Sequence, residues 1–152
     1  MDERENIIRE LLHEFKVRFT YTGYPYMVYG FLLLLDQEDL LTCMVKGLYT
    51  EIGEKFGVKA FNVEKNIRTV KYAMWDMNRH HPIFKYYDCC PSNGEFMDIV
   101  LYEIERRIAV REKKLEQMQK VDKLKLKEKE LKEKEQRLLQ MEQLLMQMEQ
   151  QA

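Results

Sequence analysis

Residues 48–75, LYTEIGEKFGVKAFNVEKNIRTVKYAMW, constrain the fold more than any other stretch, because they predict two helices joined by a tight turn. In the first helix Leu48, Ile52 and Phe56 recur at the four-residue step that keeps one helix face apolar. Gly57 then stands where helices commonly end in a left-handed residue, a conformation that glycine adopts without steric cost.

The second helix of this pair separates apolar from polar side chains. Its inward stripe is expected to consist of Val63, Ile67, Val70, Met74 and Met77. Its outward face is expected to consist of Phe61, Lys65, Arg68, Thr69 and Tyr72, with Asn62 on the flank. Such side chains reach phosphates and base edges when a helix lies in the major groove of DNA. On the pattern alone, however, an ordinary amphipathic helix with a solvated polar face is the favoured interpretation.

Three blocks of the sequence together resemble a known family. Residues 48–75 resemble the core of the C-terminal effector domain of the stage-zero sporulation response regulator. HEFKVRFTYTGYPYM (residues 13–27) and PSNGEFMDIVLYEIERR (residues 91–107) match the same domain in the same order. The resemblance covers about residues 5–107.

The resemblance implies an all-α, compact multi-helix domain that binds double-stranded DNA through a helix-turn-helix and regulates transcription by RNA polymerase. In the family this domain normally follows a phosphorylatable receiver domain. We expect no receiver here, because the chain starts only a few residues before the match. Any divalent-ion or calcium association of the family is expected in the receiver, so we expect no cofactor and no metal in this chain.

The resemblance also indicates which residues of helix 61–78 face DNA. Asn62 and Lys65 stand where the family usually has arginine, Thr69 stands where it usually has histidine, and Glu64 and Arg68 match. Lys59 replaces a small hydroxyl residue, so the helix lacks a side-chain cap and loses about 1 kcal/mol of stability at its start. We predict that bases are read by Asn62, Lys65, Arg68 and Thr69, and that phosphates are held by Lys55, Lys59 and Lys71. The full set of predicted DNA-binding residues is Asn62, Glu64, Lys65, Arg68, Thr69, Lys55, Lys59, Lys71 and Tyr72.

Charge divides the functional interpretations. Residues 1–110 carry a net charge of −3, whereas residues 55–71 carry +4. DNA-binding domains usually have a basic excess, because much of their affinity comes from neutralised phosphates. The local patch favours a site-selective DNA-binding transcription regulator. The negative domain and the altered groove residues favour the alternative, a protein-interaction module that kept the fold, lost strong DNA affinity and acts through its C-terminal helix.

Apolar spacing and breakers predict the remaining elements of the domain. We expect helices over residues 2–15 and 24–35, one long or two short helices over residues 40–56, and a short helix over residues 83–87. A strand over residues 16–23 is the less favoured alternative to a loop. The first helix should bury Ile7, Ile8, Leu11, Leu12 and Phe15. The last domain helix should be capped by Ser92 or Asn93 with Glu95, and should bury Phe96, Ile99, Val100, Tyr102 and Ile104.

Residues 111–152 form a second region with no Gly, Pro or aromatic residue, so the domain is expected to end at residue 110 and its last helix to continue unbroken. Leu124, Leu131, Leu138 and Leu145 recur at the coiled-coil interval of seven. Three residues further on lie Lys127, Lys134, Met141 and Met148. We favour a coiled-coil homodimer through residues 124–148 over a solvated single helix, and both over partial disorder.

Several classes of function find no support in the sequence. It contains no phosphate-binding glycine loop, no nucleophile elbow and no HExxH motif, so we do not expect an enzyme. The adjacent pairs His80–His81 and Cys89–Cys90 lack the two-residue gap of tetrahedral zinc sites. No apolar run is long enough to span a membrane, the N-terminus is too charged for a secretory signal, and three cysteines make no disulfide framework. We therefore expect a cytoplasmic protein.

Overall fold

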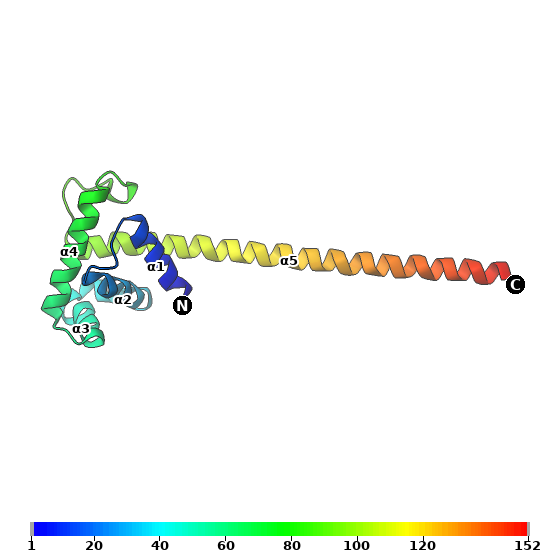
Figure 1. Cartoon of the computed structure of the whole chain (residues 1–152), viewed down its shortest axis with the longest axis horizontal. Coiled ribbons are helices and arrows are strands. Elements are labelled where there is room, and N and C mark those ends of the chain that lie inside the picture. The colour runs from blue at the N-terminus through cyan, green and yellow to red at the C-terminus, as the bar shows by residue number, and fades with distance from the viewer. Residues whose placement is uncertain (1, 152) are drawn as a thin grey trace. The chain divides into compact units, whose positions relative to one another are not determined.

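The computed structural model describes residues 2–151, and over these residues it is helical without a strand, which confirms the all-α prediction. The elements in chain order are α1 (Glu3–Glu14), α2 (Gly23–Asp36), the 3-10 helix η1 (Glu38–Thr42), the π-helix η2 (Met44–Tyr49), α3 (Thr50–Phe56), α4 (Ala60–Asn78), the 3-10 helix η3 (Pro82–Phe84) and α5 (Asn93–Gln151) (Figure 1). The chain divides into one unit that ends at Ala109 and a second that begins at Val110. Within residues 2–151, no helix combines the length and apolar character needed to cross a membrane.

Helix α1 forms as the apolar pattern predicts. Asp2 caps its N-terminus by accepting a hydrogen bond from the backbone N–H of Arg4 at 3.1 Å. The predicted stripe is fully inside the domain, since at most 2% of each side chain is exposed in Ile7, Ile8, Leu11, Leu12 and Phe15. The following loop has no strand, and Lys16 adopts a left-handed φ of 62° at its start. Helix α1 therefore supplies one wall of the core.

The segment between α2 and α3 differs from the expected α-helices over residues 40–56. It forms η1 and η2 first, and regular α-helix begins only at Thr50. Gly47 of η2 lies against η1, since a Cβ atom there would lie 2.9 Å from Cδ2 of Leu40. A larger residue at position 47 would require the end of the Leu40 side chain to shift.

The helix that follows α4 is shorter than the helix expected over residues 83–87. The 3-10 helix η3 ends at Phe84, whose side chain is 1% exposed. The Phe84 ring lies 5.3 Å from that of Trp75 and 6.4 Å from that of Phe96, measured between centroids. Tyr86, two residues later, is 84% exposed. Phe84 is therefore the fully buried residue of this segment, while Ile83 and Tyr87 pack against the core only in part.

Helix α5 begins with the predicted capping box. The backbone N–H of Glu95 donates to Oγ of Ser92 at 3.3 Å, and the backbone N–H of Ser92 donates to Oε1 of Glu95 at 3.4 Å. Its buried face consists of Phe96, Met97, Val100, Leu101 and Ile104. Tyr102, which was expected to be buried, is 70% exposed, and Ile99 is half-buried. The helix then continues unbroken to Gln151, and every side chain over residues 112–151 is exposed.

Candidate nucleic-acid interface

The turn between α3 and α4 is built by two glycines. Gly57 has a φ of 70°, in the left-handed region, as the sequence predicts. Gly53 lies one turn earlier, where an added Cβ would be 2.5 Å from the carbonyl oxygen of Val58. The backbone N–H of Val58 donates to the carbonyl of Gly53 at 2.9 Å and closes the turn. These contacts fix the direction in which α4 leaves α3.

The inward side of α4 follows the predicted stripe for four positions and then departs from it. Val63, Ile67, Val70 and Met74 are fully buried. Met77 is 58% exposed, so its predicted burial is wrong, and Trp75 at 6% exposure takes its place. A helix turns by about 100° per residue, so a rigid four-three step drifts off the core within a few turns.

Phe56, predicted to lie on the buried face of α3, is instead 38% exposed. Its ring packs on the side chains of α2, with centroids 5.1 Å from Tyr26 and 5.9 Å from Tyr29. Position 56 is the last residue of α3, directly before the left-handed Gly57. There the side chain covers the edge of the domain and does not reach its centre.

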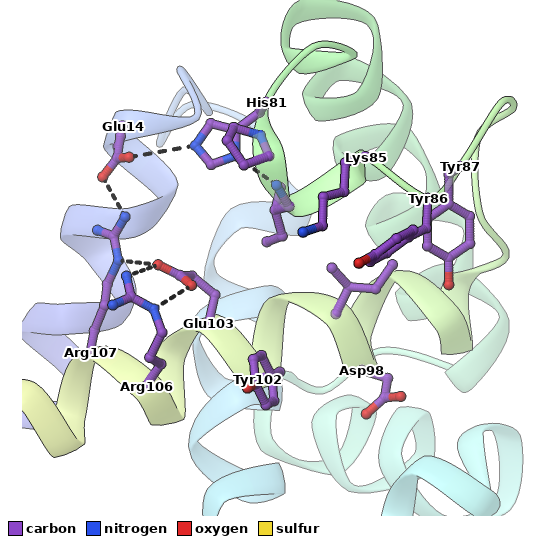
Figure 2. Close-up of a pocket in the computed structure, with 13 residues that line it drawn as sticks. Glu14, His81, Lys85, Tyr86, Tyr87, Asp98, Tyr102, Glu103, Arg106 and Arg107 are labelled. Carbon is purple, nitrogen blue, oxygen red and sulfur yellow. Dashed lines mark hydrogen bonds and ion pairs between the residues drawn. The ribbon is translucent and has the colours of Figure 1, made fainter.

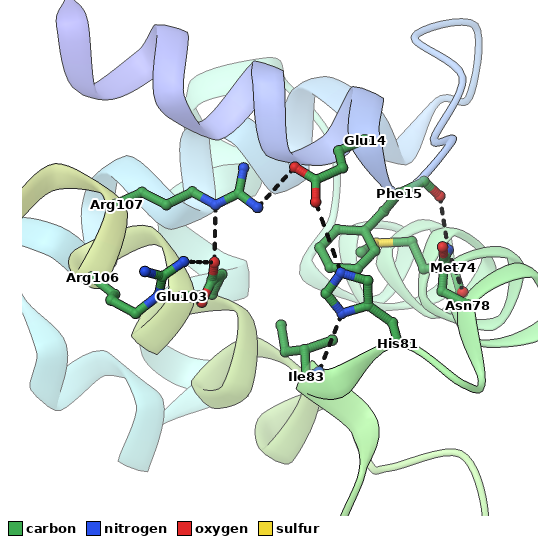
Figure 3. Close-up of polar contacts among 9 residues, drawn as sticks. All are labelled: Glu14, Phe15, Met74, Asn78, His81, Ile83, Glu103, Arg106 and Arg107. Carbon is green, nitrogen blue, oxygen red and sulfur yellow. Dashed lines mark hydrogen bonds and ion pairs between the residues drawn. The ribbon is translucent and has the colours of Figure 1, made fainter. Parts of the chain in front are cut away.

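Helix α4 is held against the domain near both of its ends. Near its start, Gly23 of α2 lies so close that an added Cβ would be 2.3 Å from the carbonyl oxygen of Asn66. At its end, Nδ2 of Asn78 donates to the carbonyl of Phe15 at 2.9 Å and to that of Met74 at 2.9 Å (Figure 3). The position of α4 is therefore set by α2 and by the end of α1, on the side opposite the exposed polar residues.

The outward side of α4 brings together the side chains that were predicted to read bases. Asn62, Lys65, Arg68 and Thr69 are exposed, and Tyr72 is 49% exposed. The hydroxyl of Thr69 donates to the carbonyl of Lys65 at 3.1 Å, which keeps this side chain close to the helix. Phe61, on the same face, is 70% exposed although it is a large apolar residue.

Glu64 and Arg68 form an ion pair one helical turn apart, with Nη2 of Arg68 donating to Oε1 of Glu64. The pair is half-exposed, since 44% of the Arg68 side chain and 31% of the Glu64 side chain remain accessible. Glu64 thus restrains the direction of the guanidinium and offsets part of its charge. A guanidinium carries five N–H donors, so the ion pair with Glu64 leaves others available for a further partner.

Lys71 does not lie on the outward face, and this corrects the prediction that it holds a phosphate. Its side chain is 4% exposed, and its Nζ lies 4.7 Å from the centroid of the Tyr72 ring. Burial lowers the pKa of the Lys71 ammonium below its ordinary value. Lys71 follows the buried Ile67 by one turn and Val70 by one residue, so its aliphatic stem covers the core.

Lys55 and Lys59 are exposed on either side of the turn. Nζ of Lys55 lies 5.7 Å from the centroid of the Tyr29 ring. Lys59 occupies the N-cap of α4 in extended conformation and makes no side-chain cap, as its chemistry predicts. Its carbonyl accepts the backbone N–H groups of Asn62 at 2.9 Å and Val63 at 3.2 Å. The two lysines therefore extend the basic surface from α4 back across the turn.

A second feature lies on other elements of the domain, a groove of about 1100 Å³ between the end of α1, η3 and the start of α5 (Figure 2). Tyr86, Tyr102 and Lys85 line it, and none of the predicted DNA-binding residues does. The sequence did not indicate this groove, because its walls come from three segments far apart in the chain. The only sequence signal was the spacing of Glu103, Arg106 and Arg107, which suits ion pairs on one helix face.

An ion-pair network closes one end of this groove. Arg107 donates to Glu103 at 2.9 Å and to Glu14 at 2.7 Å, and Arg106 donates to Glu103 at 2.7 Å. Hydrogen bonds from Arg106 and Arg107 lower the pKa of the Glu103 carboxyl to about 2. His81 lies 3.8 Å from Glu14 and accepts the backbone N–H of Ile83 at 3.1 Å (Figure 3). The network joins α1 to α5 and stabilises the domain behind α4.

No arrangement of three or more His, Cys, Asp or Glu side chains that could hold a metal ion occurs among residues 2–151. Cys43 and Cys89 are exposed as free thiols, and Cys90 is half-buried. Burial raises the pKa of the Cys90 thiol.

In a comparison with known protein families, residues 8–104 match the family described as sporulation initiation factor Spo0A C terminal. The match covers well over half of the chain and includes α3, the turn and all of α4. This agrees with the family resemblance and with the extent inferred from the sequence blocks. The family is one of DNA-binding regulatory domains and is not a class of enzymes.

Proposed function

The chain belongs to the family of the sporulation initiation factor Spo0A C-terminal domain, and we propose that it is a transcription regulator that reads double-stranded DNA with α4. The observation that carries this proposal is the separation of roles on α4. One side is anchored by Gly23, Asn78 and a fully buried apolar stripe, and the other presents polar side chains to solvent. A rigidly held helix with such a face fits the major groove.

The chemistry of the exposed side chains assigns their roles in this proposal. Arg68 and Lys65 donate to the O6 and N7 acceptors of guanine, and Asn62 pairs with adenine. Thr69 contacts a base edge or a thymine methyl group at close range, since its hydroxyl is tied to the backbone of α4. Glu64 orients the guanidinium of Arg68 through their ion pair.

Phosphate contacts are assigned to Lys55 and Lys59, on the two sides of the turn, and to the hydroxyl of Tyr72. Lys71 is removed from this group because it is buried. Few phosphates are thereby neutralised, so affinity should fall with salt less steeply than for a strongly basic DNA-binding protein. A single domain would accordingly bind weakly and depend on base contacts for its selectivity.

A DNA-binding titration at several salt concentrations tests the proposal. Duplexes recovered from a randomised pool by the purified chain serve as the target. Lys65→Ala and Arg68→Ala should each weaken binding to that target by about 1–3 kcal/mol. Lys85→Ala is the matched control, because it removes an exposed positive charge that lines the groove and lies outside α4. Equal binding by the wild type and the Lys65→Ala/Arg68→Ala double variant at moderate salt would overturn the proposal.

The second candidate function is a protein-interaction module. It is favoured by Asn62, Lys65 and Thr69, which stand on the predicted DNA-facing side of α4 where the resemblance implies arginine or histidine. If the purified chain binds no duplex from the randomised pool, this candidate stands in place of the first. In either case we propose that a second copy of the chain binds the C-terminal helix through residues 124–148. Its apolar side chains there are solvent-exposed, from 59% at Leu131 to 67% at Met148. For a DNA-binding regulator, RNA polymerase is the further partner that we propose.

A further inference from the structure

The C-terminal part of α5 carries an apolar row with the period of a coiled coil. We call it the leucine seam, and it consists of Leu124, Leu131, Leu138 and Leu145 together with Lys127, Lys134, Met141 and Met148. The four leucines are 65%, 59%, 60% and 59% exposed, although burying a leucine side chain is favourable. The second half of the seam, Leu138, Met141, Leu145 and Met148, is entirely apolar.

The residues on the two sides of the leucine seam carry different charges. The position four residues after each leucine is always glutamate, at Glu128, Glu135, Glu142 and Glu149. The position directly before each leucine is occupied by Lys123, Glu130, Arg137 and Leu144. With leucine at heptad position a, these flanks are positions e and g, the two that form charge pairs between helices and set their orientation.

In a parallel pair, each g residue lies beside the e residue of the following heptad in its partner. Lys123 then meets Glu128 of the partner subunit, and Arg137 meets Glu142 of the partner subunit, while only Glu130 meets a like charge. In an antiparallel pair, e residues face e residues, so the row of glutamates opposes itself in every register. Charge complementarity therefore distinguishes the two orientations.

We propose that two copies of this chain pair in parallel through the leucine seam, with Arg137 and Glu142 as the orienting ion pair. This rests on the tail-to-tail association proposed above and specifies its geometry. Both domains then enter the coiled coil from the same end, because each chain reaches its tail from Ala109. Two copies of α4 are thereby tethered, which suits a DNA site made of two half-sites.

The two lysines in the seam define the number of chains and the strength of the pairing. Lys127 and Lys134 at heptad position d cost stability, but in a two-stranded coil their long stems reach the flanking glutamates and water. A coil of three or more chains would enclose them more completely. The pairing is accordingly a concentration-dependent dimer.

Sedimentation equilibrium of the full chain without DNA tests the orientation, and Glu142→Arg is the most informative variant. The residues one turn away from Glu142 are Leu138 and Met146, so the substitution changes no charge pair within its own helix. In the parallel dimer it sets arginine against Arg137 of the partner subunit and should weaken association by about ten-fold. In an antiparallel dimer it relieves repulsion between glutamates and should strengthen association.

The double variant Arg137→Glu/Glu142→Arg restores opposite charges in the parallel dimer and should recover most of the lost association. Gln143→Arg is the matched control, because it places the same side chain one residue further on, away from the seam, and should leave association within about two-fold of wild type. Circular dichroism confirms that each variant keeps its helix. The proposal is overturned by stronger association of Glu142→Arg, by no recovery in the double variant, or by a wild type that stays monomeric to high micromolar concentration. Because DNA is absent, each of these outcomes leaves the DNA-binding proposal to its own titration.

Discussion

Replacing Gly23 by alanine tests whether the start of α4 is positioned by direct backbone contact with α2. A Cβ atom at position 23 would lie 2.3 Å from the carbonyl oxygen of Asn66, 2.7 Å from its carbonyl carbon and 2.9 Å from Cγ2 of Val70. The first two are backbone atoms inside a helix, so neither can rotate away as a flexible side chain would. The two helices must therefore separate, and α4 must move relative to the rest of the core.

The expected cost follows from two opposing contributions. Forcing an additional methyl group into a well-packed core typically costs about 1–3 kcal/mol. Replacing glycine by alanine in the middle of a helix returns roughly 0.5–1 kcal/mol, because alanine loses less conformational entropy on folding, and at Gly23, the first residue of α2, the gain is at most that large. The contact at Gly23 is with backbone, so the cost belongs at the upper end and the net loss should be about 2 kcal/mol. For a domain of about 100 residues this lowers Tm by roughly 8–16 °C.

Fluorescence of Trp75 is the appropriate assay, because it is the single tryptophan of the chain. Its side chain is 6% exposed in the core, so its emission reports unfolding of the domain without a contribution from the C-terminal helix. Gly94→Ala is the matched control, since an added Cβ there meets nothing within 4 Å. It should be as stable as the wild type or slightly more stable. If Gly23→Ala and Gly94→Ala unfold at the same temperature, the contact between α2 and α4 does not set the position of α4.

Three further predictions concern single side chains of the same domain. Ile67→Ala should lower the free energy of unfolding by about 2–5 kcal/mol, because a fully buried aliphatic side chain is cut back to a methyl group. A denaturant titration followed by Trp75 fluorescence measures this loss. A change below about 1 kcal/mol would contradict the burial of Ile67 on the inward side of α4. Lys71→Met should leave the salt dependence of DNA binding unchanged, whereas Lys59→Ala should reduce the slope of log K against log salt by about 1. A reduced slope for Lys71→Met would show instead that Lys71 reaches a phosphate. The folded-state pKa of Glu103 is lowered from 4.5 to about 2, so its stabilising contribution is complete above pH 4.5 and is lost as pH falls toward 2. Glu103→Gln should therefore lower the free energy of unfolding by about 1–2 kcal/mol at pH 7 and by progressively less below pH 4.5. An equal loss at pH 7 and below pH 4.5 would show that the ionised carboxylate is not the source of the stabilisation.

The sequence was sufficient where a regular period or a special backbone residue decides the structure. The apolar spacing located the buried side of α4 from Val63 to Met74, and Gly57 marked the end of α3. The Ser92–Glu95 capping box marked the start of α5. Each of these depends on residues within a few positions of one another, and for that reason local pattern alone predicts it.

The errors arise where distant segments decide burial. The basic patch of residues 55–71 predicts that Lys71 holds a phosphate, but packing against the core buries its side chain. Extending the stripe predicts that Met77 is buried, but the 100° step of the helix turns this position off the core and leaves it exposed. The contact of Gly23 with Asn66 has no signature within one segment, and for the groove beside α5 the spacing of Glu103, Arg106 and Arg107 indicates only ion pairs on one helix face. Such features require the three-dimensional arrangement of the helices.

The two sides of α4 differ in how closely they follow the family that the sequence resembles. The groups that hold the helix in place are glycine contacts, a backbone-directed asparagine and aliphatic side chains, all on the inward side. The residues at which the resemblance implies a departure from the family, Asn62, Lys65 and Thr69, are all exposed on the outward side. Substitution there alters which bases can be contacted without disturbing the packing that positions the helix. Lysine supplies a point charge where arginine forks onto guanine, and asparagine favours adenine. If α4 reads DNA as proposed, these substitutions predict that the chain prefers a DNA sequence different from that of family members with arginine and histidine at the same positions.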